Sequence, residues 1–290
     1  MFLKYSSGSK SVSIRSVYRS SNRLSESFHW LEAGQENDET LILIHGYLAH
    51  SFAFRKVMER LAQRWHVIAP DLPGHGRDGT FDSRAVEPEI YDLIDWFEHF
   101  LEVATDDDSI YVAGHSLGAL LCFIAGREQQ RFAPIERIAL VSPGVRIGLP
   151  QWTSRIFDLV PSALAQFGAT ELGMRLYEPI QWRKTRMTRE EVRRYLKPLK
   201  DSDRLDFMLD LGADLLSEPD RLPGAHRVDV PTLIVTGEKD HLLPVETVRL
   251  LNEVIPDSEL EVLDGVGHCP MEDTPTAFAR LIERFLLDAV

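Results

Sequence analysis

A tight turn around Ser116 constrains the fold of this chain more than any other feature of its sequence. Residues 109–113 have the composition of a strand, the sequence Gly-His-Ser-Leu-Gly follows at 114–118, and the apolar run after it favours a helix. So abrupt a turn holds the serine in a strained backbone conformation, which flanking glycines tolerate because they have no Cβ. The pattern therefore predicts that the Ser116 hydroxyl is exposed at the end of a buried strand.

Four segments with distinctive motifs together extend over nearly the whole sequence. In chain order they are His45-Gly46-Tyr47-Leu48, Asp71-Leu72-Pro73-Gly74-His75-Gly76, Gly114-His115-Ser116-Leu117-Gly118, and Gly237-Glu238-Lys239-Asp240 followed by Gly267-His268. These segments resemble the α/β-hydrolase family. The family orders its catalytic residues as Ser, then Asp or Glu, then His. Ser116, Asp240 and His268 stand in that order, so the resemblance implies an α/β-hydrolase fold with a mostly parallel sheet, flanking helices and an inserted helical cap over the active site.

Apolar runs along the chain agree with such a sheet. Runs typical of parallel strands buried on both faces occur at residues 40–44, 65–70, 109–113, 138–142, 231–236 and 260–263. Helical stripes are predicted at residues 51–64, at 88–103, after Ser116 and from Thr274 onward. Residues 11–20 and 26–32 predict two leading antiparallel strands.

The strand pattern stops between Ser142 and Pro231, which is too long an interval for a plain connection between strands. We therefore expect a core in two parts, residues 1–144 and 229–290, separated by a helical cap at 145–228. The cap holds more apolar side chains than its own small core needs. Trp152, Phe157 and Trp182 are the candidates for lining a substrate pocket.

Composition narrows the partners that such a protein would have. The chain has 290 residues, of which 44% are hydrophobic, and a net charge of −13, which disfavours nucleic acid or an anionic membrane surface as its main partner. No signal peptide or membrane span is recognisable, which predicts a cytoplasmic location. Cys122 and Cys269 are expected to be free, packed thiols. Neither zinc-ligand spacing nor a dinucleotide fingerprint occurs, so no metal and no cofactor are expected.

The residues of the predicted triad have complementary chemistry. A serine hydroxyl is a poor nucleophile at neutral pH and needs a base, which in turn needs an orienting acid. His268 is the expected base and Asp240 the expected acid. Glu238 and Asp264 are the alternatives, but Glu238 lies within the turn and Asp264 is only four residues before the histidine. Gly237-x-x-Asp240 matches the acid motif of the family that the chain resembles.

An acyl-transfer reaction also needs backbone N–H groups that stabilise the oxyanion of its intermediate. By position, the resemblance assigns these donors to Leu117 and Tyr47. The Tyr47 phenol either enters the substrate pocket or packs. His45 and His115 flank glycine turns and are expected to be structural neighbours of the site.

A serine at the nucleophile position excludes the aspartate-dependent branches of the family, such as epoxide hydrolases and haloalkane dehalogenases. The favoured function is therefore hydrolysis of a carboxylic ester of a small hydrophobic molecule. The same residues are also compatible with a thioesterase acting on coenzyme A or carrier-protein substrates, a lactonase or a carbon–carbon bond hydrolase. A ligand-binding sensor that retains the fold is the alternative from another class.

A basic segment in the expected cap bears on that choice. Between Gln181 and Lys200, eight basic residues oppose only two glutamates. Thr188-x-x-Glu191 predicts a capping box at the start of a short helix that Pro198 stops, with Arg189, Arg193 and Lys197 on one side. Such a face could steer coenzyme A or an acyl carrier protein to the site, unless the aspartates that follow neutralise it: Asp203, Asp206, Asp210 and Asp214.

Overall fold

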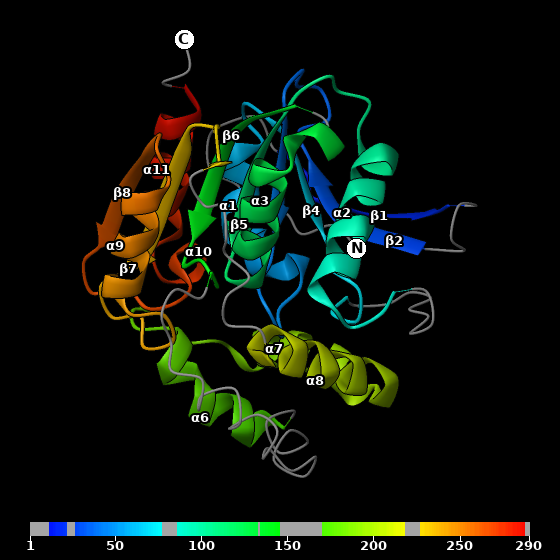
Figure 1. The fold of residues 1–290 in the computed structure, drawn as a ribbon. Helices are drawn as coiled ribbons and strands as arrows, with labels where there is room; N and C mark the ends of the chain where they lie inside the picture. Colours follow the sequence, from blue (N-terminus) through cyan, green and yellow to red (C-terminus); the bar gives the residue numbers. More distant parts are fainter. Residues whose placement is uncertain are drawn as a thin grey trace.

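A computed structural model describes residues 12–21, 27–76, 86–132, 134–145, 170–217 and 227–287. Within these ranges the chain forms an eight-stranded sheet in the order β1-β2-β4-β3-β5-β6-β7-β8 (Figure 1). The strands are β1 (Arg15–Ser20), β2 (Ser27–Ala33), β3 (Thr40–Ile44), β4 (His66–Pro70), β5 (Ile110–His115), β6 (Ile135–Val141), β7 (Thr232–Gly237) and β8 (Ser258–Leu263). β2 is antiparallel to β1 and β4, as the sequence predicts for the first two strands, and the remaining pairs are parallel.

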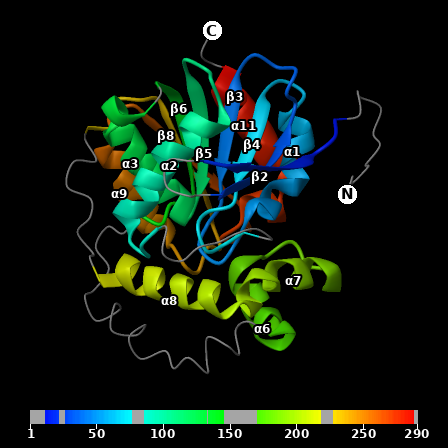
Figure 2. The ribbon, with the colours of Figure 1, turned by 90° about the vertical axis from the view of Figure 1, so that its right-hand side faces the viewer.

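Helices cover both faces of the sheet, and an apolar cluster fills the space on each face. Side chains along each central strand alternate between these two clusters. The helices of the sheet layers are α1 (Arg55–Leu61), α2 (Ile90–Ala104), α3 (Leu117–Arg127), α9 (Val245–Val254), α10 (Pro270–Asp273) and α11 (Pro275–Leu287). In β3, Ile42 and Ile44 belong to the cluster with α2, α3 and α9, whereas Leu41 and Leu43 belong to the one with α1 and α11 (Figure 2). Both faces of the central strands are therefore buried, which explains their uninterrupted apolar sequences.

Several elements differ from the sequence prediction. The helix expected at residues 51–64 is a 3-10 turn η1 (Ser51–Phe54) followed by α1, which ends at Leu61. The strand expected from Ile138 begins at Ile135, and α9 was not predicted. A second 3-10 turn, η2 (Gln129–Arg131), follows α3.

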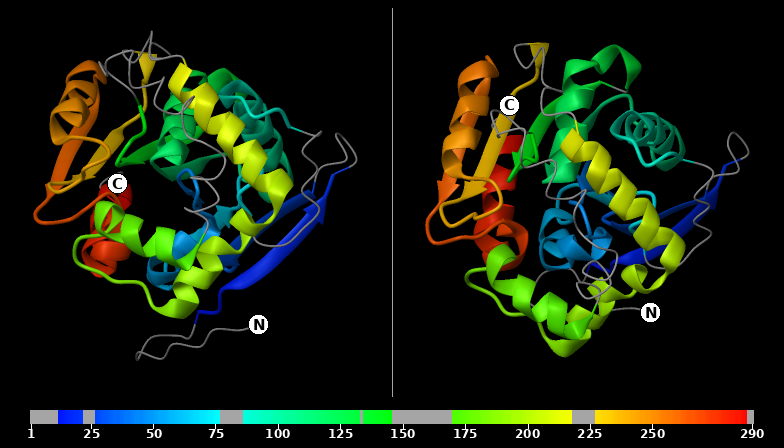
Figure 3. Two further views of the ribbon diagram at one scale, coloured as in Figure 1. Left: turned by 90° about the horizontal axis from the view of Figure 1, so that it is seen from below. Right: turned by 60° about the horizontal axis from the view of Figure 1, so that its bottom comes forward.

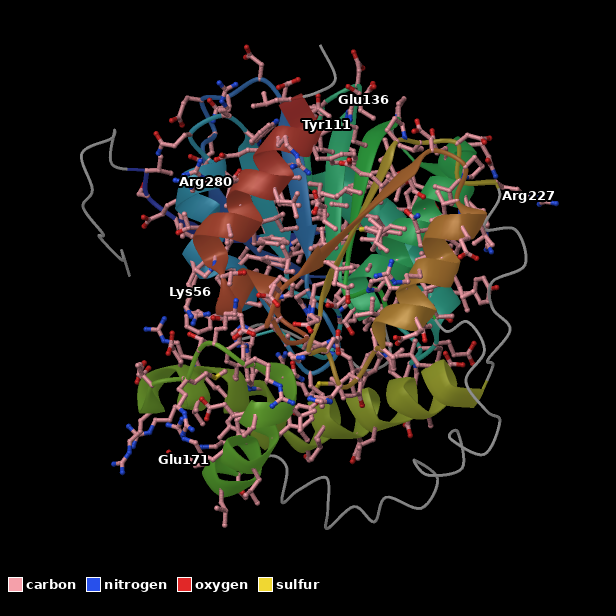
Figure 4. The ribbon with its side chains drawn as sticks, turned by 90° about the vertical axis from the view of Figure 1, so that its left-hand side faces the viewer. Lys56, Tyr111, Glu136, Glu171, Arg227 and Arg280 are labelled. Atoms are coloured by element: carbon pink, nitrogen blue, oxygen red, sulfur yellow. The ribbon has the colours of Figure 1, made fainter. Side chains whose placement is uncertain are left out.

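Three further helices lie together at the carboxyl end of the sheet (Figure 3). They are α6 (Glu171–Gln181), α7 (Arg189–Leu196) and α8 (Ser202–Ser217), with a 3-10 turn η4 (Pro198–Lys200) before α8. Figure 4 shows Glu171 of α6 at the opposite end of the molecule from Tyr111, which is near the amino end of β5. The predicted capping box of α7 is confirmed, since Thr188 and Glu191 bond reciprocally. Residues 146–169 and 218–226 of the expected cap lie outside the described residues.

A buried ionic cluster joins α7 to the sheet layers. Arg55 of α1 pairs with Glu191 of α7 and with Glu272 of α10. Lys56 approaches the Glu272 carboxylate to 2.7 Å, and the Tyr195 hydroxyl donates to it at 2.8 Å. Removing one partner would leave buried charge uncompensated, so this cluster fixes α7 in place. None of the helices in the described ranges has the length and apolar character needed to cross a bilayer.

Candidate active site

The turn around Ser116 has the strained geometry that its sequence predicts. Ser116 lies between β5 and α3 with φ 52° and ψ −110°, a left-handed conformation unfavourable for a residue with a side chain. A Cβ on Gly114 would lie 2.2 Å from the carbonyl oxygen of Gly118, and one on Gly118 would lie 2.2 Å from that of Ile44. Only glycine fits at both positions. The Ser116 side chain remains partly exposed at the end of the strand.

Asp240 and His268 are in direct contact. Nδ1 of His268 donates to Oδ2 of Asp240 at 2.8 Å, and both residues are buried. The other carboxylate oxygen of Asp240 accepts the N–H groups of Leu242 and Leu243 at 2.9 and 3.0 Å. Burial raises the pKa of Asp240, but the bonds and charge from His268 and the two backbone donors outweigh it and lower the pKa. Asp240 is therefore an ionised carboxylate that fixes the ring of His268.

The two alternative acids lie elsewhere. Glu238 accepts from Nζ of Lys239 at 2.9 Å and from the N–H of Gly265 at 3.0 Å. Asp264 is exposed. Of these three carboxylates, the structure brings Asp240 to the histidine.

His115 links the serine turn to the histidine loop. Its Nε2 donates to the carbonyl oxygen of His268 at 2.9 Å, and the centroids of the two rings are 4.8 Å apart. Burial lowers the pKa of His115 to about 3, so its ring is neutral. His115, which the sequence predicts to be a structural neighbour of the site, therefore also contacts His268 directly.

The two expected oxyanion donors lie beside Ser116. Leu117 is the first residue of α3, where an N–H has no acceptor within the helix. A Cβ on Gly46, next to Tyr47, would lie 3.0 Å from Cβ of Ser116, so the loop after β3 closely approaches the serine. The Tyr47 hydroxyl donates to the carbonyl oxygen of Met208 in α8 at 2.6 Å, and burial raises its pKa.

Residues 41–281 match the model of the alpha/beta hydrolase family. The chain belongs to this family. Among its curated relatives, an uncharacterized protein of Mycobacterium tuberculosis is 26% identical over 265 residues, covering 85% of this chain and 74% of that protein. A pimeloyl-[acyl-carrier protein] methyl ester esterase of Aeromonas hydrophila is 26% identical over 254 residues, covering 85% and 94%. The crystal structure of a putative lipase from Acinetobacter baumannii AYE has a TM-score of 0.78 at 22% identity and covers 95% of this chain and 91% of its own.

Of the three aromatic residues of the expected cap that were predicted to line the pocket, the structure describes Trp182. Trp182, just after α6, is buried, and its ring centroid is 6.3 Å from that of Tyr195 in α7. Its indole Nε1 is buried without a hydrogen-bond partner among the described residues. Trp152 and Phe157 lie outside the described residues.

Polar contacts around the site go beyond the sequence predictions, because His45 was expected as a structural neighbour without named partners and Asp273 was not predicted. His45 uses both ring nitrogens, since Nδ1 donates to the carbonyl of Gly46 at 2.8 Å and Nε2 accepts the N–H of Leu72 at 2.9 Å. Asp273, close after His268, binds a series of backbone N–H groups. The histidine beside the glycine turn was a usable signal for the first contact, whereas nothing in the sequence marks the second.

Proposed function

We propose that this α/β-hydrolase is a serine hydrolase that cleaves a carboxylic ester of a small hydrophobic molecule through an acyl-enzyme at Ser116. The observation that carries the proposal is the 2.8 Å hydrogen bond between Asp240 and His268, in a loop that His115 ties to the serine turn. A histidine oriented by a carboxylate is the base that a serine hydroxyl requires.

In the proposed reaction, Nε2 of His268 takes the proton of the Ser116 hydroxyl while Oγ attacks the ester carbonyl carbon. The oxyanion of the tetrahedral intermediate accepts the N–H groups of Tyr47 and Leu117. Collapse breaks the bond to the leaving alkoxide, which receives the proton from His268. A water molecule, deprotonated by the same ring, then attacks the acyl-enzyme and releases the acid and the free serine. Asp240 keeps the imidazolium oriented and compensates its charge.

The helices α6, α7 and α8 belong, in this proposal, to a cap at residues 145–228 that shapes the substrate pocket. Their position at the carboxyl end of the sheet supports it, because sites of α/β sheets gather there. Tyr47, Trp152, Phe157 and Trp182 are the proposed substrate contacts. We expect them to recognise the apolar part of the ester, since pockets of this kind are mostly apolar.

A thioester of coenzyme A or of an acyl carrier protein is the second candidate substrate. Arg186 and Arg189 are exposed and form no ion pair with any described residue. Arg193 and Arg194 pair with Glu171 and Glu190 and not with the aspartates of α8. The relative from Aeromonas hydrophila supports a carrier protein as partner, although the bond in its name is a methyl ester and not a thioester. A lactonase, a carbon–carbon bond hydrolase and a ligand-binding sensor are other uses of the same fold.

Turnover of p-nitrophenyl esters and acyl-CoA thioesters of graded chain length tests the proposal. The wild-type protein should hydrolyse the esters, and Ser116→Ala should not, while its circular dichroism and Tm stay unchanged. Hydrolysis of neither substrate class by the wild-type protein would favour the sensor.

The two substrate classes separate further by their response to salt. If the basic face steers an anionic thioester, kcat/KM for acyl-CoA should fall as ionic strength rises, whereas that for a neutral ester should not. Arg189→Glu should remove most of the difference. If kcat/KM responds equally to salt for both substrates, the basic face of Arg189, Arg193 and Lys197 has a structural role. The result would then favour a carboxylesterase that acts on neutral esters.

A further inference from the structure

The carboxylate of Asp273 holds two separate stretches of backbone together. Its Oδ1 accepts the N–H groups of Arg183, Lys184 and Thr185 at 3.1, 3.0 and 3.1 Å. Its Oδ2 accepts those of Arg183 and Gly267 at 2.9 Å each. The side chain is buried and, within the described residues, takes part in no ion pair. Backbone donors alone therefore compensate its charge.

These donors come from the two segments that meet at the proposed base. The first is the connection between α6 and α7, and the second is the residue directly before His268. At the same junction the N–H of His268 donates to the carbonyl oxygen of Gln181 at 2.9 Å, and Sγ of Cys269 donates to Oε1 of Gln181 at 3.1 Å. A Cβ on Gly267 would lie 2.7 Å from that same Gln181 carbonyl oxygen. The fit between the segments is thus close and specific.

An ionised carboxylate suits this arrangement better than any neutral side chain of the same size. Its two oxygens offer about four lone-pair sites and no donor. An asparagine offers one oxygen, and its NH₂ group would point at the N–H groups that the other oxygen had accepted. A buried donor without an acceptor is costly, so the amide would weaken the contact between the two segments.

We propose that Asp273 is a positioning residue, which ties the α6–α7 connection to the loop of His268 and so holds the imidazole between Asp240 and Ser116. On this view the α6–α7 connection sets the geometry of the reaction in addition to any part it has in covering the substrate. The inference rests on the proposed function, because it assigns the role through His268.

Glu272 provides a matched control on the same short helix. It is adjacent to Asp273 and also buried, but its carboxylate contacts Arg55, Lys56 and Tyr195 and not the histidine loop. Glu272→Gln and Asp273→Asn are the same chemical change at neighbouring positions. A purely structural role for Asp273 would give the two variants the same behaviour.

The test compares both variants with the wild-type protein on a short p-nitrophenyl ester, at a temperature where circular dichroism shows all three folded. Asp273→Asn should lower kcat by about 10²-fold with little change in KM, the scale expected for a misplaced catalytic group. Glu272→Gln should lower Tm but keep the wild-type kcat. A wild-type kcat in Asp273→Asn, or an equal loss of kcat in both variants, would overturn the proposal.

Amide hydrogen exchange tests the tie without relying on activity. Asp273→Asn should speed exchange at residues 183–185 and 267–268, and Glu272→Gln should not. Unchanged exchange at these amides would show that Asp273 does not join the two segments, whereas an inactive wild-type protein would overturn the proposed function instead.

If Asp273→Asn does not fold, Asp273→Glu keeps the charge and should show a severalfold smaller kcat with faster exchange at the same amides. A wild-type kcat together with wild-type amide exchange in Asp273→Glu would also contradict the proposal.

Discussion

Ser116 would owe its reactivity to its neighbours and not to its own chemistry. The left-handed turn presents the hydroxyl, and the glycines on either side make the turn possible. His268 is the proposed base, while Asp240 and His115 hold its side chain and its backbone. The motifs pointed to Ser116, His268 and Asp240, and their catalytic roles stay predictions. The hydrogen bond from His115 to a carbonyl 153 positions away could not be predicted, because it depends on how two distant loops meet.

Replacing the carboxylate of Asp240 tests the assignment of the acid. Asp240→Asn should reduce kcat by roughly 10³- to 10⁴-fold, as occurs in other triads when the histidine is held in the wrong tautomer. Glu238→Gln is the control, because Glu238 is exposed and bonds to Lys239 and Gly265. Steady-state kinetics on a p-nitrophenyl ester measures both. A large loss in Glu238→Gln with a small one in Asp240→Asn would show that the acid is misassigned.

Individual elements were predictable where their signals are local. The capping box at Thr188 located the start of α7, because the two bonds of the box join residues three positions apart. The helix α9 was missed, since only Val248 and Leu251 of its residues are buried and its apolar stripe is correspondingly narrow. The role of Asp273 was invisible for another reason. Most of its donors are backbone N–H groups of residues 183–185, about ninety positions away, and backbone donors leave no trace in a sequence.

Trp182 tests whether the segment between α6 and α7 selects substrates. Each buried methylene of an acyl chain contributes about 0.8 kcal/mol, so Trp182→Ala should change the ratio of kcat/KM between long and short acyl esters severalfold. Leu176→Ala is the control, because Leu176 is 62% exposed on α6. Parallel changes for all chain lengths in Trp182→Ala would remove this residue from the proposed pocket.

The whole molecule combines a sheet that the sequence predicted well with a topology that it did not specify. Buried strands stand out as apolar runs, but their order depends on pairing between distant segments. β3, for example, lies between β4 and β5, so the chain passes from β3 outward to β4 and back. The family resemblance implied a mostly parallel sheet with flanking helices but did not give that order. The resemblance also implied a helical cap inserted into the core. The division into a core of residues 1–144 and 229–290 and a cap at 145–228 stays a proposal.

Buried neutral histidines should make the stability of the molecule depend on pH. Burial lowers the pKa of His45 to about 4 and those of His75 and His115 to about 3, from an ordinary value of 6.5. Between about pH 4 and 6.5 the unfolded chain therefore binds more protons than the folded one, and the free energy of unfolding should rise with pH across this window. Each histidine contributes a slope of up to about 1.4 kcal/mol per pH unit.

Urea unfolding at a series of pH values measures this slope. His75→Asn is an informative variant, because the amide can replace the ring nitrogen that donates to the carbonyl of Pro73 at 2.8 Å. In this variant, the free energy of unfolding should rise less steeply with pH, by the contribution of one histidine. A slope that is the same in the variant, or a wild-type stability that does not change across the window, would contradict the burial of a neutral ring.

Covalent labelling of the wild-type protein with a fluorophosphonate tests the central claim most directly, because only an activated serine reacts. Peptide mapping by mass spectrometry should find one phosphonylated residue, Ser116, and Ser116→Ala should carry no label. His268→Ala should fold yet label far more slowly, since the hydroxyl loses its base. A wild-type protein that is not labelled, or a label found at another serine, would show that Ser116 is not the nucleophile of this α/β-hydrolase.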